Sequence, residues 1–171
     1  MRKDIVKLLN NYCSDLGWFF SYGNKANQNL LQSTYDNNLE NNQIYFLLDP
    51  VRRISSFGEF GGVGRKTYRG NFLLVVQSDI DMTYYNQTNQ EEFLNRFNSK
   101  DNPVIVESCP DTVKGKYEEN IRPIIEDQLP KIENLINCSD YRIDSWEYID
   151  ATDVFDANTD GITVSFSISV L

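Results

Sequence analysis

The side chains that most enzymes use for chemistry near neutral pH are scarce in this chain. It has no histidine, and this excludes Ser-His-Asp and Cys-His nucleophile systems as well as the commonest zinc and iron sites. Cys13 lies on the apolar stripe of a predicted helix, where burial raises the pKa of a thiol. Neighbouring carboxylates such as Glu118 and Glu119 point apart on a helix and make poor acid–base pairs. We therefore expect a protein that is not an enzyme and that needs no cofactor.

Two short motifs resemble binding loops, but each lacks an essential part. Residues 156–161, Asp-Ala-Asn-Thr-Asp-Gly, match the first half of a calcium-binding loop. That loop needs a bidentate glutamate at its twelfth position, where this chain has Ser167. Residues 61–66, Gly-Gly-Val-Gly-Arg-Lys, resemble a phosphate-binding loop but lack its Gly-Lys-Ser/Thr ending. We therefore interpret the first motif as a hairpin turn, and we expect neither a metal nor a nucleotide.

Net charge and cysteine usage bear on partners and on location. Lys and Arg number 16 against 25 Asp and Glu, a net charge of −9, which disfavours nonspecific binding to nucleic acid or to anionic membranes. The sequence contains no run of about 18 apolar residues, so we expect no membrane span. The three cysteines, Cys13, Cys109 and Cys138, are not clustered, and this favours free thiols in a reducing cytoplasm.

The basic residues concentrate in one segment. Residues 51–70 carry five basic residues against Glu59 alone, a net charge of +4 that leaves −13 for the rest of the chain. Residues 55–64 hold four glycines and two phenylalanines, a composition that does not fit a packed strand. We therefore predict a protruding, basic, glycine-rich arm over residues 51–66.

Two hypotheses for this arm remain open. In the first it is a solvated hairpin with basic flanks. In the second it is an assembly arm, flexible alone and ordered against an acidic neighbour, with its phenylalanines at the centre of the contact. The residues of this hypothetical interface are Arg52, Arg53, Phe57, Phe60, Arg65, Lys66 and Arg69.

The N-terminal half predicts one helix and three strands around the arm. Apolar residues recur at helical spacing over residues 4–16, which predicts an amphipathic helix. Strands are predicted over residues 18–22 and 44–48, and the second is apolar on both faces, as a central strand is. A third strand is predicted from residue 67 to about residue 79. The Asn- and Gln-rich residues 24–43 are interpreted as a loop that holds at most a short helix.

The C-terminal half predicts two helices and a closing hairpin. A capping box at Thr88–Glu91 begins a helix that extends through Phe97, and a short edge strand is predicted over residues 103–107. A long amphipathic helix over residues 117–136 is interrupted by Pro123 and Pro130. Pro123 fits the first turn if the helix starts late; otherwise each proline marks a kink.

The last 31 residues, 141–171, predict a β-hairpin that closes the core. Its first strand has an expected bulge at Asp144–Ser145. Its second strand alternates apolar and small polar residues, so one face is predicted to be buried. The residues of that buried face are Ile162, Val164, Phe166, Ile168 and Val170.

These elements predict one α+β domain spanning residues 1–171. Its sheet is mixed and mostly antiparallel, with helices packed on one face, the arm between two central strands, and a C-terminal β-hairpin. This architecture resembles the tail terminator proteins of tailed bacteriophages, also called tail completion or head–tail joining proteins. The most specific part of the resemblance is the turn at residues 156–161 followed by the alternating strand 162–170.

The resemblance implies a structural protein of the virion, without an active site or a cofactor. Such proteins form a hexameric ring that caps the tail tube and joins it to the head connector, and DNA is free to pass through the ring without specific binding. The implied partners are other copies of this chain, the tail-tube protein and the head–tail connector protein, with no membrane. The implied location is the tail or neck of the virion, after synthesis in the bacterial cytoplasm.

Two alternatives to this function remain open. One is a neck or tail-tube-like ring protein of a short-tailed phage. The other is a monomeric, acidic protein-binding module that recognises a basic partner. The oligomeric state separates the second alternative from both ring proteins.

Overall fold

A six-stranded sheet organises the protein and confirms the predicted α+β class. The computed structural model describes residues 4–24, 43–78, 116–154 and 159–170. The strand order is β1-β2-β4-β6-β5, and β3 pairs with β4 off this path. Among the described strands, β1 and β2 pair in parallel and the other pairs are antiparallel. The elements are α1 (Ile5–Leu16), β1 (Phe19–Tyr22), β2 (Tyr45–Leu48), β3 (Arg52–Phe57), β4 (Val63–Gln77), η1 (Tyr117–Ile121), η2 (Ile124–Gln128), α4 (Leu129–Asn137), β5 (Tyr141–Val154) and β6 (Thr159–Val170).

Helix α1 forms where the spacing of its apolar residues predicts it. Asp4 caps its N-terminus by accepting a hydrogen bond from the Val6 N–H at 3.2 Å. Gly17 ends it with a φ of 73°, a conformation that is strained for residues with a side chain. The stripe that it buries consists of Ile5, Leu8, Leu9 and Cys13.

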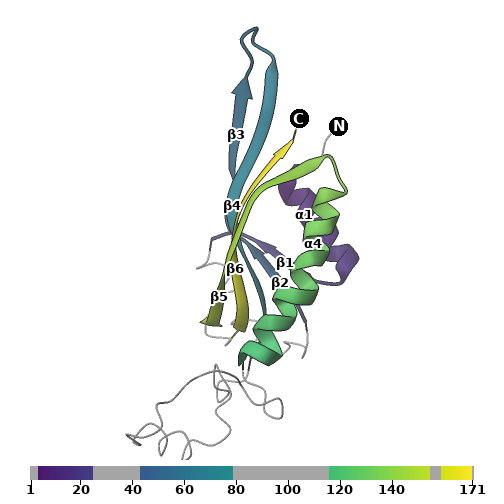
Figure 1. Ribbon diagram of the computed structural model, residues 1–171, viewed down its shortest axis with the longest axis vertical. Helices are drawn as coiled ribbons and strands as arrows, with labels where there is room; N and C mark the ends of the chain where they lie inside the picture. Colours follow the sequence, from purple (N-terminus) through teal and green to yellow (C-terminus); the bar gives the residue numbers. More distant parts are fainter. Residues whose placement is uncertain (1–3, 25–42, 79–115, 155–158, 171) are drawn as a thin grey trace, which may run out of the picture.

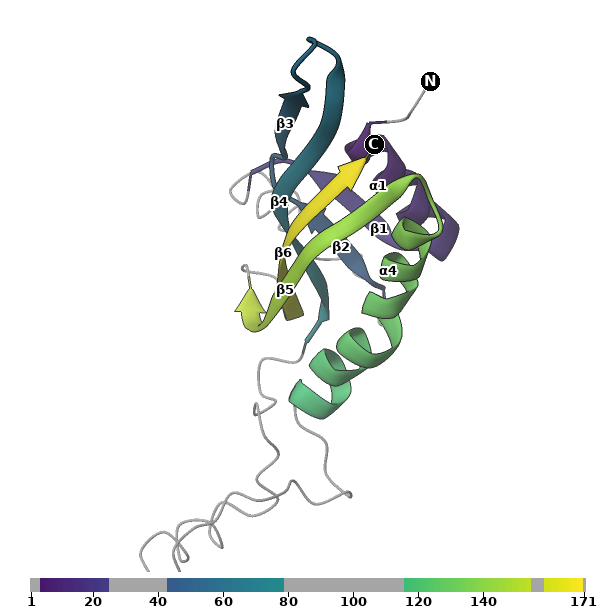
Figure 2. The same ribbon diagram turned by 45° about the horizontal axis from the view of Figure 1, so that its top comes forward.

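The main core lies between one face of the sheet and the two helical segments, which Figures 1 and 2 show on the same side of the sheet. All five residues of β6 that the alternation assigns to the core face are buried. Side chains on β4, such as Phe72 and Leu74, join them because paired positions share a face. A smaller cluster on the opposite face consists of Tyr45, Leu47, Leu73 and Val75. Burial of β2 on both faces confirms that it is a central strand, between β1 and β4.

The interruptions predicted at Pro123 and Pro130 take the form of two π-helical turns, η1 and η2. Each proline follows one such turn, in which the last N–H bonds five residues back, from Arg122 to the Tyr117 carbonyl and from Leu129 to the Ile124 carbonyl. A proline has no N–H to donate and its ring crowds the carbonyl four residues earlier. The wider turn accommodates both constraints within a helical path.

The predicted turn at residues 156–161 is wrong for its last three residues, which belong to β6. Gly161 pairs with Val75, and a Cβ at this position would collide with the Leu74 carbonyl oxygen, so the glycine serves close strand approach. Asp160 is buried rather than exposed in a turn. Its carboxylate lies 3.9 Å from Lys116 Nζ.

Asn120 belongs to the same polar cluster. Its Nδ2 donates hydrogen bonds to Asp160 Oδ2 and to Ser78 Oγ, each at 3.2 Å. The cluster therefore joins the end of β4, the first turn of the helical segment and the start of β6.

Other boundaries differ from the sequence-based prediction by a few residues. β4 begins at Val63 instead of residue 67, because the glycine-rich segment pairs as a hairpin. The predicted bulge in β5 is confirmed by a register shift between Ile143 and Ser145. The helix predicted through Phe97, the edge strand at 103–107, the segment 25–42 and Cys109 lie outside the described residues.

Candidate assembly surface on the β3–β4 hairpin

The arm predicted from the sequence is a two-stranded hairpin in the structure (Figure 1). β3 pairs with the first half of β4 from Arg52 opposite Arg69 to Phe57 opposite Val63. β6 ends at Val170, opposite Lys66, and beyond that position the described residues pair β4 with β3 alone. This backbone matches the hairpin of the first hypothesis, and the assembly role of the second is argued below.

The tip of the hairpin displays two phenylalanines. A tight turn closes it, with the Gly58 N–H bonded to the Gly62 carbonyl at 2.8 Å and a φ of 79° at Gly61. Phe60 is 100% exposed and Phe57 is 68% exposed. Burying one such ring is worth about 1.5–3 kcal/mol, so the tip gains substantially if a partner covers it.

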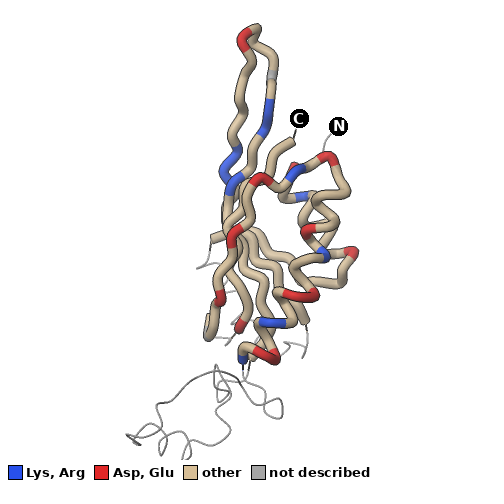
Figure 3. Tube along the Cα trace, in the orientation of Figure 1, with Lys and Arg blue, Asp and Glu red and all other residues tan. Residues whose placement is uncertain are grey.

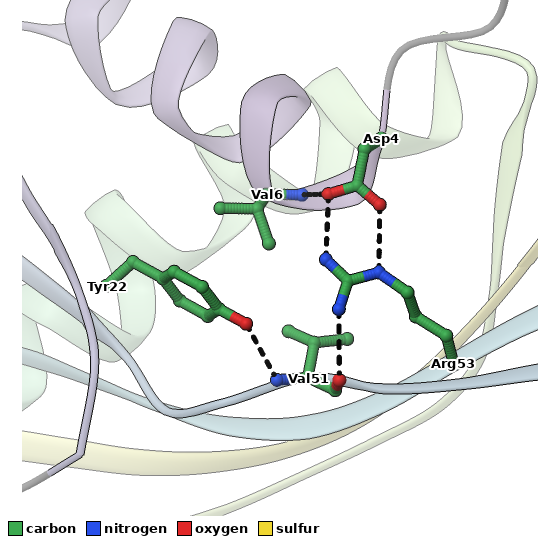
Figure 4. Close-up of polar contacts among 5 residues, drawn as sticks. All are labelled: Asp4, Val6, Tyr22, Val51 and Arg53. Atoms are coloured by element: carbon green, nitrogen blue, oxygen red, sulfur yellow. Dashed lines mark hydrogen bonds and ion pairs between the residues drawn. The ribbon is translucent and has the colours of Figure 1, made fainter.

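Arg53 ties the base of the hairpin to α1 (Figure 4). Its Nε and Nη2 donate to the two carboxylate oxygens of Asp4, each at 3.0 Å, and its Nη1 donates to the Val51 carbonyl at 3.3 Å. The Tyr22 hydroxyl accepts from the Val51 N–H at 3.3 Å. Hydrogen bonds from Arg53 lower the pKa of Asp4 below its usual value and raise the pKa of Arg53. These four residues form what we call the helix-side anchor.

Arg65 ties the hairpin to β5 and β6 on the opposite face of the sheet. Its Nη2 donates to Ser169 Oγ at 2.6 Å and to Asp144 Oδ1. Ser169 in turn donates to Asp144 at 3.1 Å. Asp144 occupies the bulge of β5, so the irregularity in that strand places the carboxylate within reach of Arg65. Arg65, Asp144 and Ser169 form the outer anchor.

The other cationic residues of the predicted interface remain available. Arg52, Lys66 and Arg69 are exposed and form no ion pair within the described part of the chain. Figure 3 shows basic residues grouped on the lower part of the hairpin. Arg52 and Arg69 lie directly opposite each other, a like-charge pairing that destabilises a sheet by roughly 0.2–1 kcal/mol. Of the seven predicted residues, Arg53 and Arg65 are therefore engaged internally, and five are free to meet a partner.

Two further exposed apolar side chains lie on β5, and neither was predicted as a site. Ile149 is 71% exposed and Tyr148 is 47% exposed, between the exposed residues Glu147 and Asp150. β5 is the last strand in the sheet order. Tyr148 pairs with Val164 on the core face and Ile149 pairs with Thr163, so the two side chains point to opposite faces of the sheet. The sequence shows an apolar pair between acids, but not that the strand lies at an edge.

The described ranges place the acidic and thiol side chains that a metal centre or a reactive cysteine would use. No group of three or more Asp, Glu or Cys side chains there is arranged to hold a metal ion. Cys13 is buried, and burial raises its pKa to about 12, as predicted for an unreactive core thiol, whereas Cys138 is exposed. In the same residues, none of the helices has the length and apolar character needed to span a bilayer.

The chain was also compared with known proteins. No protein-family model matches it, and neither the curated proteins nor the solved structures gave a significant match. The resemblance to tail terminator proteins therefore depends on the order of elements and the motifs in the sequence.

Proposed function

We propose that this protein is a structural subunit that assembles with copies of itself into a ring through the β3–β4 hairpin. We further propose that the ring, a hexamer, caps a phage tail tube and joins it to the head connector. The observation that carries the assembly proposal is a fully exposed Phe60, with Phe57 beside it, on a hairpin anchored from both faces. The phage role is supported by the resemblance in the sequence.

The fixed base of the hairpin favours assembly because it reduces the entropy that is lost on association. A partner that binds a disordered arm must first order it, whereas this hairpin already has its strands paired and its base fixed at Arg53 and Arg65. Burial of Phe57 and Phe60 then contributes directly to the contact. The three free cations lower on the hairpin steer it toward an acidic surface, and the rest of the chain carries a net charge of −13.

A ring follows if the hairpin of each subunit contacts a different surface of its neighbour. Such a heterologous contact repeats by rotation and closes when the rotation divides a full turn. A tail tube is an open stack of rings, so its growth ends when a ring docks on one side and offers a different surface on the other. In this role the protein performs no chemical step and resides in the tail or neck of the virion.

The assembly proposal is tested by removing the tip without disturbing the anchors. Replacing residues 55–64 with a short Gly-Ser turn is expected to abolish oligomers, measured by light scattering alone and with the tail-tube protein. Circular dichroism and the melting temperature are expected to stay near those of the parent, because the tip is exposed. Glu59→Gln is the matched control, since it changes the tip charge and retains both phenylalanines. A parent protein that stays strictly monomeric under both conditions would overturn the proposal and favour the monomeric binding module.

The phage role is tested by deleting the gene. The expected result is filled heads without tails, next to free tails of abnormal length, in electron micrographs. Tails of normal length attached to heads would contradict the terminator role. Heads without any tail material would favour a neck protein of a short-tailed phage.

A further inference from the structure

We infer that two carboxylates, Asp4 and Asp144, are positioning residues for assembly. Each holds one arginine of the β3–β4 hairpin and so fixes the direction in which the hairpin projects from the sheet. That direction decides whether the proposed ring closes. The inference rests on the proposed self-assembly and names the residues that set its geometry. Neither carboxylate has to touch the neighbouring copy.

The sheet alone gives the hairpin little support. Residues 49–51 separate β2 from β3, so the strand beside β4 is interrupted there. Gly70 lies on β4 at this interruption, and a Cβ at its position would lie 3.1 Å from the Phe166 ring, so β4 carries no side chain at this point. Beyond Lys66 the described residues pair β4 with β3 alone, and a two-stranded hairpin is only marginally stable by itself.

The two anchors brace the hairpin from opposite faces of the sheet. The helix-side anchor joins β3 to the N-terminus of α1 through two hydrogen bonds of 3.0 Å from Arg53 to Asp4 (Figure 4). The outer anchor joins β4 to β5 and β6 through Arg65, Asp144 and Ser169. Because a bend lengthens the convex face of a sheet, a bend away from the helices stretches the helix-side anchor, and a bend toward them stretches the outer anchor. Each anchor therefore opposes one direction of bending.

The direction of the hairpin matters more for closing a ring than for forming one contact. A heterologous contact repeats the same rotation at every subunit, and the ring closes when that rotation divides a full turn. An error of about 10° at each of six contacts adds up to about 60°, the share of one subunit in a hexamer. Loosened anchors are therefore expected to leave the tip contact intact and to give open chains and rings of several sizes.

A distance measurement within one chain tests the brace directly. In a background with Cys109→Ser and Cys138→Ser, and with the buried Cys13 left in place, spin labels are attached at Phe60→Cys on the tip and Asn10→Cys on α1. Both positions are exposed. Double electron–electron resonance measures the distance between the labels, and dilution with unlabelled protein restricts the signal to one chain. A narrow distance distribution is expected while both anchors are intact.

Removing both carboxylates is expected to broaden and shift that distribution. Asp4→Ser keeps a hydroxyl for the cap of α1, and Asp144→Ala removes an acceptor of Arg65. The melting temperature is expected to stay near that of the parent, because both pairs are partly exposed. The matched control combines Asp15→Ser and Glu147→Ala, which remove one exposed acid from α1 and one from β5 outside the anchors. A distribution as narrow in the anchor variant as in the control would overturn the inference.

Ring size gives an independent measurement in the otherwise unchanged chain. Native mass spectrometry and electron micrographs are expected to show one ring size for the parent, and open chains with rings of several sizes for Asp4→Ser combined with Asp144→Ala. Asp144→Arg, which repels Arg65, is expected to act in the same way. Adding Arg65→Asp to it restores the pair in reverse and is expected to restore the single ring size, which a general loss of stability would not do.

The outcomes separate this inference from the proposed function. A single ring size in every anchor variant would overturn the inference and leave self-assembly through the hairpin standing. Complete loss of oligomers from a folded anchor variant would also overturn it, because the anchors would then act on the contact itself. Failure of the parent protein to form any oligomer would overturn both.

Discussion

The two halves of β4 belong to one continuous strand but have different surroundings. In the second half, Phe72 to Val75 are buried between β2 and β6, with helices over one face and a second apolar cluster on the other. In the first half, which begins at Val63, most side chains are exposed and β3 replaces β2 as the neighbour. Backbone pairing is antiparallel in both halves. Backbone pairing is therefore enough to form a strand. Side chains packed on its two faces decide whether the strand stabilises the fold or remains available to a partner.

The largest expected effect is a loss of stability, and it distinguishes the buried half of β4 from the exposed half. Leu74→Ala is expected to lower the free energy of unfolding by about 2–5 kcal/mol, because Leu74 is fully buried at the centre of the sheet. Phe60→Ala in the tip is the comparison, and it is expected to change that free energy by less than about 0.5 kcal/mol. Urea denaturation of both variants measures the difference. A large loss from Phe60→Ala would show that the tip is part of the core.

A smaller loss of stability is expected from substitutions in the helix-side anchor, at the base of the hairpin. Asp4→Ala removes both the cap of α1 and the ion pair with Arg53, and it is expected to cost about 1–2 kcal/mol. Asp4→Asn keeps a capping oxygen and removes the charge, and it is expected to cost only about 0.5 kcal/mol, because the pair is partly exposed. Comparing the two variants separates the cap from the ion pair.

The pH dependence of the Asp4 effect has a definite sign. Arg53 lowers the pKa of Asp4 in the folded protein from the usual value of 3.8, so the ion pair stabilises the fold fully above that value. The contribution is lost as the pH falls through the lowered pKa. The deficit of Asp4→Asn is therefore expected to be present at pH 7 and to shrink as the pH is lowered below about 3.8. A deficit that is constant over this range would contradict the ion-pair explanation.

The smallest expected effect is a gain in stability. Arg52→Glu places an acid opposite Arg69 in place of a like charge, and it is expected to raise the free energy of unfolding by about 0.5 kcal/mol while weakening self-assembly. Arg52→Gln, which removes only the repulsion, is the matched control. If Arg52→Glu strengthens assembly as well, Arg52 does not meet an acidic partner. Charge reversal at Arg53 or Arg65 is a poorer test of assembly, because it also breaks an anchor.

Local pattern predicted much of the fold. The spacing of Ile5, Leu8, Leu9 and Cys13 specifies the buried stripe of α1, and Gly17 its end, because a helix and its cap depend on residues a few positions apart. The alternation from Ile162 to Val170 specifies which face of β6 is buried, because side chains in a strand alternate between faces. The composition of residues 55–64 likewise marks them as unsuited to the core. These features require no knowledge of distant residues.

The tertiary structure alone decided what depends on distant pairing. Arg53 and Arg65 look equivalent to Arg52 and Arg69 in the sequence, yet Asp4 and Asp144, 49 and 79 residues away, engage the first two. Exposure of Ile149 follows from the edge position of β5, and burial of Ser169 follows from its contacts with Arg65 and Asp144. A local pattern shows which face a side chain takes. Which strand or helix covers that face is set by contacts between segments far apart in the chain, and only the folded structure reveals them.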